Sequence, residues 1–286
     1  MAQRAAGTCR YAPRKPHGAA LLSDATPGLI DLGRYPINSP NDEGYLALLD
    51  RCRGDLEATG ACVLDGFVIS ERLPQIVAEI KPHIGEAFFA TKHHNAYLIP
   101  DDPDLPDDHP RNRTQTTDSA TLGYSFIPKD SLLNGIYSWD RFVAFVADVL
   151  GYDRLYPYAD PLAPVNVLVY EQGCQTGWHF DNASFTVTLL LQESEGGTFE
   201  YAPFVRSNED EAYDTVAEVL EERSDRVQEL RQRPGSLVIF TGSRTLHRVT
   251  PVTAPRARLV SVFSYSREVG TELDPHTRMT FYGRLS

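Results

Sequence analysis

The chain has 286 residues, of which 42% are hydrophobic, so it is long enough to bury one sizeable core. Its formal net charge of -12, with a pI of about 5.1, argues against nucleic-acid binding, which needs a basic face. No apolar run approaches the length of a membrane span, and the first residues lack the apolar core of a signal peptide. The four cysteines show no metal-site spacing. We therefore expect a cytoplasmic protein without nucleic-acid or membrane partners.

The N-terminal half is predicted to alternate helices with short extended segments. Residues 1–28 combine Arg, Gly, Ala and Pro without periodicity, which indicates a flexible tail. Apolar residues at helical spacing and helix-breaking prolines set the later boundaries. The expected elements are a helix over 45–58, a strand over 61–64, a helix over 71–89 interrupted at Pro82, a Pro- and Asp-rich loop over 99–113, and a helix over 137–150.

The C-terminal half has the pattern of short strands separated by turn residues. The expected strands cover 166–170, 185–192, the residues after the Gly196-Gly197 turn, 236–240 and 258–265, with a charged helix over 210–230. This spacing favours an α+β protein with a double-stranded β-helix (jelly roll, cupin-like) core and flanking helices. We expect one domain over 29–286, with the core over about 160–266 and a helical insertion over about 208–231.

Three residues of this half have the pattern of a metal site. His179 and Asp181 stand two apart, so on an extended strand both side chains point the same way. His247 follows 68 residues later and must return through the fold. Two imidazoles and one carboxylate cover one face of a metal ion and leave the opposite face open, as in the facial triad of non-haem Fe(II) oxygenases. We predict that these three residues are the metal ligands and form the catalytic centre.

The surrounding sequence strengthens this prediction. A His-x-Asp pair by itself is a weak signal, because a His on an apolar strand is more often a core residue. Here the pair is followed by a Pro234-Gly235 turn, a strand, His247, and a basic residue on the next strand. The combination favours a metal centre over a satisfied core histidine.

Two arginines compete as the partner of an anionic cosubstrate. Arg258 lies 11 residues past His247 and opens an apolar strand, whereas Arg256 lies nine past it in a Thr-Ala-Pro-Arg-Ala loop. A buried Arg needs an anionic partner, and its planar guanidinium can form two parallel hydrogen bonds to one carboxylate. We favour Arg258 because of its position on the strand.

The chain resembles Fe(II)/2-oxoglutarate-dependent oxygenases, in particular the branch of free-amino-acid hydroxylases and halogenases, together with fungal oxygenases that close small nitrogen rings. The resemblance spans about residues 30–265, and the segments that carry it are 30–37, 159–163, 177–181, 185–192, 199–201 and 247–252. It implies Fe(II) as the metal, 2-oxoglutarate as cosubstrate and O2 as oxidant. The distal carboxylate of 2-oxoglutarate would then bind Arg258.

Asp181 bears on the type of reaction. In the related halogenases a small residue replaces the carboxylate ligand, and chloride takes the vacant position. Because this chain retains Asp181, the resemblance implies hydroxylation of an unactivated C–H bond, most simply in a free amino acid or an amino-acid-derived natural-product precursor. The same hydrogen abstraction could instead lead to desaturation or to ring closure, as in aziridine formation.

The residues around the substrate are less clearly marked. Asn166 and Tyr170 share a strand face and are candidates for contacting the cosubstrate. An amino-acid carboxylate needs a cation, for which Arg113 is the first candidate. The other candidate substrate residues are Thr117, Asn182 and Ser184, and we expect His93 and His94 to lie at the surface.

Two other function classes stay open at this point. One is a non-catalytic jelly-roll module that retains a metal site, and the other is a cupin that needs a metal but no cosubstrate. The latter usually has more His ligands and would leave Arg258 idle. We expect a small molecule as the partner, and a monomer or a homodimer.

Overall fold

The computed structural model describes residues 26–286, so the predicted tail over 1–28 lies almost entirely outside the described residues. The helices are α2 (Glu43–Thr59), α3 (Leu73–Ile80), α4 (Leu132–Ser138), α5 (Asp140–Leu150), α6 (Tyr213–Leu220) and α7 (Pro275–Tyr282), with short 3-10 helices η1 (Thr26–Leu29), η2 (Lys81–Glu86) and η3 (Tyr124–Phe126). None of the helices within 26–286 has the length and apolar character that crossing a bilayer requires.

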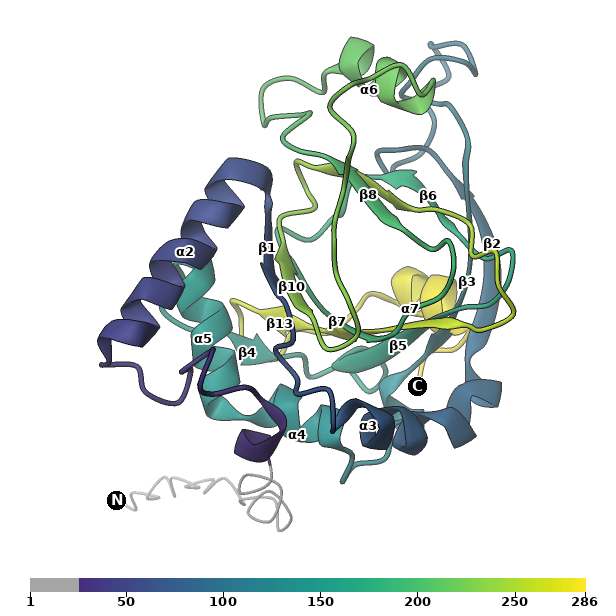
Figure 1. Cartoon of the computed structure of the whole chain (residues 1–286). Helices are drawn as coiled ribbons and strands as arrows, with labels where there is room; N and C mark the ends of the chain where they lie inside the picture. Colours follow the sequence, from purple (N-terminus) through teal and green to yellow (C-terminus); the bar gives the residue numbers. More distant parts are fainter. Residues whose placement is uncertain (1–25) are drawn as a thin grey trace, which may run out of the picture.

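Two antiparallel sheets face one another across the centre of the molecule (Figure 1). The strands are β1 (Ala61–Leu64), β2 (Phe88–His94), β3 (Gln115–Leu122), β4 (Tyr156–Pro157), β5 (Val165–Tyr170), β6 (Thr176–His179), β7 (Thr186–Gln192), β8 (Phe199–Ala202), β9 (Gln228–Glu229), β10 (Leu237–Phe240), β11 (Leu246–Val249), β12 (Arg258–Phe263) and β13 (Tyr265–Ser266). The major sheet has the order β1-β10-β7-β12-β5-β3-β2, the minor sheet has the order β6-β11-β8-β9, and β4 pairs with β13. This architecture confirms the predicted double-stranded β-helix with flanking helices.

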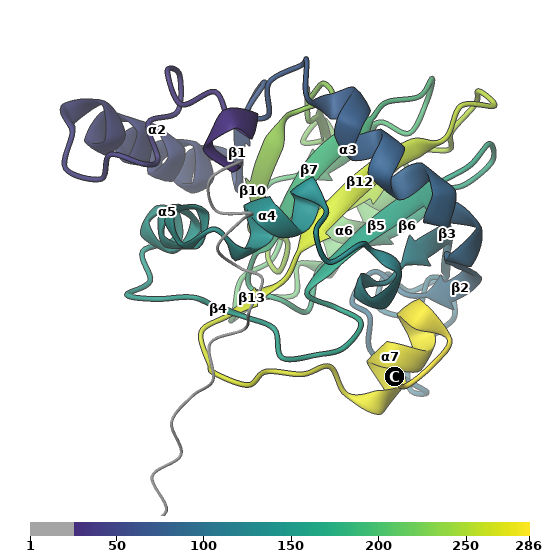
Figure 2. The ribbon, with the colours of Figure 1, turned by 90° about the horizontal axis from the view of Figure 1, so that it is seen from below.

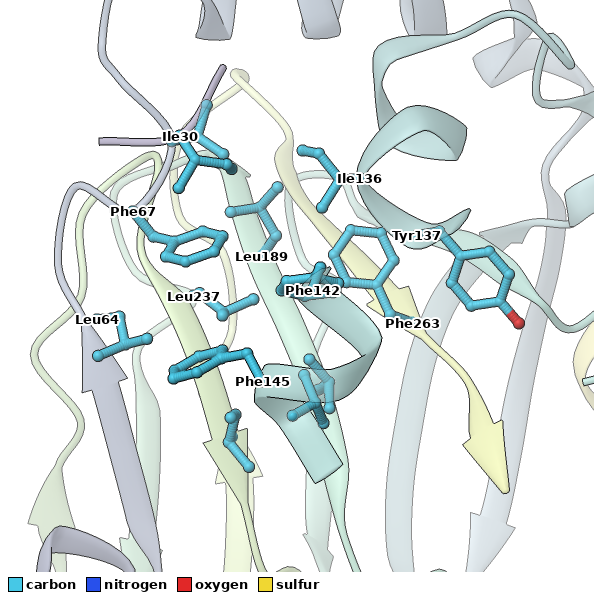
Figure 3. Close-up of a cluster of buried hydrophobic side chains, with 14 of the residues drawn as sticks. Ile30, Leu64, Phe67, Ile136, Tyr137, Phe142, Phe145, Leu189, Leu237 and Phe263 are labelled. Atoms are coloured by element: carbon cyan, nitrogen blue, oxygen red, sulfur yellow. The ribbon is translucent and has the colours of Figure 1, made fainter. Parts of the chain in front are cut away.

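The main core lies between the major sheet and the helices α2 to α5, which cover its outer face (Figure 2). On α5, Phe142 and Phe145 recur at helical spacing and pack against strand residues such as Leu189 and Phe263 (Figure 3). Because side chains alternate along a strand, the opposite face of the same sheet points toward the minor sheet. The inner faces of the two sheets therefore form the walls of the functional site.

Several predicted boundaries need correction. The single helix over 137–150 is two helices that meet at Trp139, and the helix over 71–89 ends as a 3-10 turn at Glu86 before β2 begins. The charged helix over 210–230 is limited to α6, whose Val216, Val219 and Leu220 are buried. Past Leu220 the chain turns through Glu222, which has a φ of 57°, and adds β9 to the edge of the minor sheet.

Candidate metal centre

Strand β6 sets the direction of the first two candidate ligands. Trp178 and Phe180 are buried on one side, where they pack against α6. The alternation along the extended chain sends His179 and Asp181 to the other side, toward the barrel interior. Asp181 stands just past the end of the strand, where Thr186, at the start of β7, can reach it.

Strand β11 brings the third candidate to the same place. His247 is the direct antiparallel partner of His179, and their ring centres lie 4.1 Å apart. Oδ1 of Asp181 lies 3.4 Å from Nε2 of His179 and 3.5 Å from Nε2 of His247. Within residues 26–286 these three residues are the one group of His, Cys, Asp or Glu side chains whose ligand atoms gather within 4.8 Å. The fold therefore brings together the three residues that the sequence singled out.

The hydrogen bonds of the two imidazoles fix which nitrogens face inward. Nδ1 of His179 lies 2.9 Å from the Gly177 carbonyl, and Nδ1 of His247 lies 2.9 Å from the Thr245 carbonyl. Since a carbonyl only accepts, each Nδ1 carries the proton, and in the neutral ring Nε2 presents a lone pair to Asp181. Burial lowers the pKa of His247, which favours the neutral form.

The surroundings of Asp181 favour its ionised form. Burial by itself would raise its pKa, but the positive charge and the N–H groups of His247 and His179, when these rings are protonated, hold the pKa of Asp181 well below its usual range. Its Oδ2 accepts a hydrogen bond from the Thr186 hydroxyl at 2.8 Å, which leaves Oδ1 toward the imidazoles. When both rings are neutral, their two Nε2 lone pairs and the Asp181 carboxylate oxygen converge on one point. Such a donor set fits a divalent transition metal with open positions.

The loop before β11 is shaped around this carboxylate. The carbonyl of Gly242 accepts a hydrogen bond from the Asp181 backbone at 3.1 Å. A side chain at position 242 would place its Cβ 2.0 Å from Oδ2 of Asp181, so only glycine leaves room. Phe199 stacks on His247 with the ring centres 5.4 Å apart and limits its rotation.

Arg258 and Arg256 have very different surroundings. Arg258 is buried at the start of β12, opposite Tyr170 on β5, whereas Arg256 is exposed. No carboxylate within the described part of the chain pairs with Arg258, and burial lowers the pKa of its guanidinium. The side chain has room because Gly197 lacks a Cβ, which would lie 2.9 Å from Cδ of Arg258. A buried cation without a protein partner is suited to an anionic ligand.

The two candidate cosubstrate residues already have protein partners. The Tyr170 hydroxyl lies 2.9 Å from Oγ1 of Thr176, and Nδ2 of Asn166 donates to the Tyr282 hydroxyl at 3.3 Å. Both residues lie on the inner face of β5, and Tyr170 also faces Arg258 across the register. They line the same interior as the three converging residues.

The candidate substrate residues fall into two groups. Asn182 and Ser184 line a hollow of about 440 Å³, whose wall also includes Thr186. Arg113 instead forms an ion pair with Glu221 at 3.5 Å, at the end of α6. Thr117 is buried, where its hydroxyl lies 2.8 Å from Nε2 of His94 and accepts a hydrogen bond from the Gly177 amide at 3.1 Å.

His94 is the residue that the sequence analysis placed incorrectly. It is half-buried on β2, and its ring centre lies 6.1 Å from that of His179, whereas His93 is exposed as expected. Nδ1 of His94 donates to the Asn95 carbonyl at 3.0 Å, so Nε2 accepts a hydrogen bond from the Thr117 hydroxyl. The alternation of β2 could have indicated an inward position, but the polar sequence of this segment did not reveal a strand.

Comparison with known proteins identifies the group to which the chain is related. The model of the family described as Halogenase D (HalD) matches residues 111–281, which is more than half of the chain. A search among curated proteins finds no match.

Solved structures share the fold at low sequence identity. The 2-oxoglutarate-dependent epimerase SnoN from nogalamycin biosynthesis has a TM-score of 0.55 and 14% identity, with 77% of this chain and 81% of that chain covered. AviO1 from Streptomyces viridochromogenes Tue57 has a TM-score of 0.51 and 13% identity, with coverage of 79% and 96%. HygX from Streptomyces hygroscopicus, solved with nickel, 2-oxoglutarate and hygromycin B, has a TM-score of 0.50 and 13% identity, with coverage of 82% and 90%.

The family match and the shared fold agree with the expected enzyme class, and His179, Asp181 and His247 form a group that could hold a metal ion. The match to residues 111–281 extends from the loop before β3 to α7 and so includes the residues that form the candidate metal centre. The chain therefore belongs to the Halogenase D family.

Proposed function

We propose that this enzyme hydroxylates an unactivated C–H bond of a small molecule, with His179, Asp181 and His247 as the iron ligands. The observation that carries the proposal is the convergence of two Nε2 atoms and one carboxylate oxygen, each oriented by a hydrogen bond on its far side. Three protein ligands on one face would leave positions for 2-oxoglutarate and O2. Arg258 would hold the distal carboxylate of 2-oxoglutarate.

The retained carboxylate distinguishes this chain from the halogenases that it resembles. Chloride needs a vacant coordination position, and Asp181 would fill that position. The Thr186 hydroxyl donates a hydrogen bond to the Asp181 carboxylate, and Gly242 packs against it. These two contacts fix the position of the carboxylate. We therefore favour oxygen insertion over chlorination. Desaturation and ring closure begin with the same hydrogen abstraction, and the substrate decides between these outcomes.

The proposed substrate class is a free amino acid or a compound derived from one. The hollow beside Thr186 has a volume of about 440 Å³, which suits a small molecule. Its lining residues include Arg267 and Glu268, together with Asn182 and Ser184. One cation and one anion in the same hollow complement the two charges of an amino acid. Arg267 thus replaces Arg113 as our candidate for the substrate carboxylate, because Arg113 is already paired.

The chain contributes positioning, charge and exclusion of water. The bound iron and 2-oxoglutarate would supply the oxidising chemistry. Thr186 and the Gly177 and Thr245 carbonyls orient the three ligands, while Arg258 fixes the far end of the cosubstrate. Phe199 and Phe240 pack around His247 and keep solvent from that side of the site.

The proposal is tested by the release of succinate from 2-oxoglutarate under air with added Fe(II). The wild-type enzyme is expected to release succinate, faster with an amino-acid mixture than without it. His179→Ala, Asp181→Ala and His247→Ala are each expected to abolish this release with the fold retained in circular dichroism. Wild-type rates from any of the three would remove that residue from the metal site.

A further inference from the structure

Arg206, in the loop after β8, stacks on the residue that separates two of the proposed ligands. Its guanidinium carbon lies 4.2 Å from the ring centre of Phe180 and 5.7 Å from that of Tyr97. Phe180 is fully buried and stands between His179 and Asp181. A guanidinium over an aromatic face is attracted by the electrons of the ring and also excludes water from it. Arg206 therefore restrains the backbone segment that carries these two ligands.

The same guanidinium also holds the loop on the other side of the site. Nε of Arg206 donates to the Ser243 carbonyl at 2.7 Å. Ser243 directly follows Gly242, whose carbonyl accepts the Asp181 amide proton and whose Cα packs against the Asp181 carboxylate. Nη1 of Arg206 lies 3.2 Å from Oε2 of Glu211, and this ion pair restrains the other end of the guanidinium. One side chain thus connects the 179–181 segment to the 241–244 loop.

We infer that Arg206 is a positioning residue for the metal centre, an inference that rests on the proposed ligand set. Asp181 belongs to the first segment and packs against Gly242 of the second, so the spacing of the two segments sets the distance from its carboxylate to His247, which follows the loop on β11. The role needs both the flat face and the fixed Nε donor of arginine, and lysine offers neither in this geometry. Residues that orient metal ligands from outside typically change metal affinity about 10- to 100-fold when they are removed.

Arg244 provides a matched control. It lies in the same loop, and its guanidinium also stacks on an aromatic ring, that of Phe204, with 5.3 Å between the guanidinium carbon and the ring centre. Arg244 is exposed, and its side chain makes no hydrogen bond to the 179–181 segment or to Ser243 within the described residues. Loss of a stacked surface arginine should therefore not disturb the site.

The experiment uses the full chain and Co(II), which reports its coordination by visible absorption and does not react with 2-oxoglutarate and O2 as iron does. Wild type, Arg206→Gln, Arg206→Lys and Arg244→Gln are titrated with Co(II), and melting temperatures are measured in parallel. We expect Arg206→Gln and Arg206→Lys to bind Co(II) at least about 10-fold more weakly, with altered d–d bands, and Arg244→Gln to match the wild type within about 2-fold.

The outcomes separate the possible roles. Wild-type Co(II) affinity and spectrum in a folded Arg206→Gln, even with a lowered melting temperature, would make the role only structural and overturn the inference. If Arg206→Gln does not fold, the milder Arg206→Lys decides in the same way. Failure of the wild type to bind one Co(II) per chain would instead refute the proposed metal centre itself. This result differs from normal Co(II) binding that is unchanged in the Arg206 variants.

Discussion

Gly242 lies so close to Asp181 that a Cβ at position 242 would stand 2.0 Å from the carboxylate Oδ2 and 2.6 Å from Cγ. Asp181 lies just past the end of β6 and Gly242 lies in the loop before β11, and the antiparallel pairing of β6 with β11 holds these two segments together. The space that glycine leaves is occupied by the Asp181 carboxylate, a proposed metal ligand. In this chain, the loop before β11 and the retained aspartate are therefore matched to each other.

The first prediction follows from this contact. Gly242→Ala must displace the Asp181 carboxylate, so we expect Co(II) affinity to fall at least about 10-fold, as for other changes that misplace a ligand. Isothermal titration calorimetry of the folded variant with Co(II) measures this affinity. Gly54→Ala, in α2 with open space around the added methyl group, serves as control and should bind Co(II) normally while gaining about 0.5–1 kcal/mol of stability. Unchanged Co(II) affinity in Gly242→Ala would show that Asp181 is not a ligand.

The second prediction separates the two arginines near β12. Arg258→Ala should raise the apparent 2-oxoglutarate requirement about 10-fold or more, because a desolvated two-pronged contact to a carboxylate contributes a few kcal/mol. Arg256→Ala, at an exposed position, should change it less than about 2-fold. Initial rates of succinate formation against 2-oxoglutarate concentration provide the measurement, and the reverse ranking would assign the cosubstrate to Arg256. Arg258→Met should not lower the melting temperature, since it removes a buried charge without a protein partner.

The third prediction concerns stability in acid. The buried Asp160 carboxylate accepts hydrogen bonds from the Leu162, Ala163 and Leu273 amides and from Arg278. Burial by itself would raise its pKa, but these four donors bring the pKa of Asp160 below its usual value. The stabilisation is therefore present above the unfolded-state pKa of about 3.9 and is lost as the pH falls toward the lower folded-state pKa.

We accordingly expect Asp160→Asn to lower the unfolding free energy by about 3 kcal/mol at pH 7, by leaving Arg278 without its buried partner. The difference in unfolding free energy between Asp160→Asn and the wild type should become smaller below about pH 4. Urea unfolding at both pH values measures it, with the exposed Asp225→Asn as control. If this free-energy difference were the same at pH 7 and below about pH 4, the charge of Asp160 would not be the source of the stability.

The fourth prediction concerns the outcome of the reaction. The wild type should give no chlorinated product at any chloride concentration, because Asp181 would occupy the position that chloride needs. Asp181→Gly should lose most hydroxylation, since two imidazoles hold iron weakly, and it could yield a minor chlorinated product with added chloride. Mass spectrometry of the product formed in saturating chloride is the measurement. A chlorine isotope pattern from the wild type would overturn the hydroxylase proposal.

The polar strands were the hardest part of the fold to predict. Strand β3 carries Thr117, Ser119 and Thr121 on its inner face, and the inward-facing residues of β2 include Lys92 and His94. Their inner faces carry polar side chains, so the usual alternation of apolar and polar residues is absent. The C-terminal helix α7 was also not foreseen, because its sequence has few apolar residues to bury.

By itself, the sequence singled out the residues of the proposed site from local pattern: the His-x-Asp spacing on an extended segment, a histidine on a returning strand, and an arginine opening an apolar strand. These follow from strand periodicity, which acts over a few residues. The tertiary structure alone decided what surrounds them, namely Thr186, Gly242, His94 and Arg206 around the ligands, and the pairing of Arg113 with Glu221. These contacts join segments far apart in the chain, and their partners are set by the packing of two sheets, which no local pattern specifies.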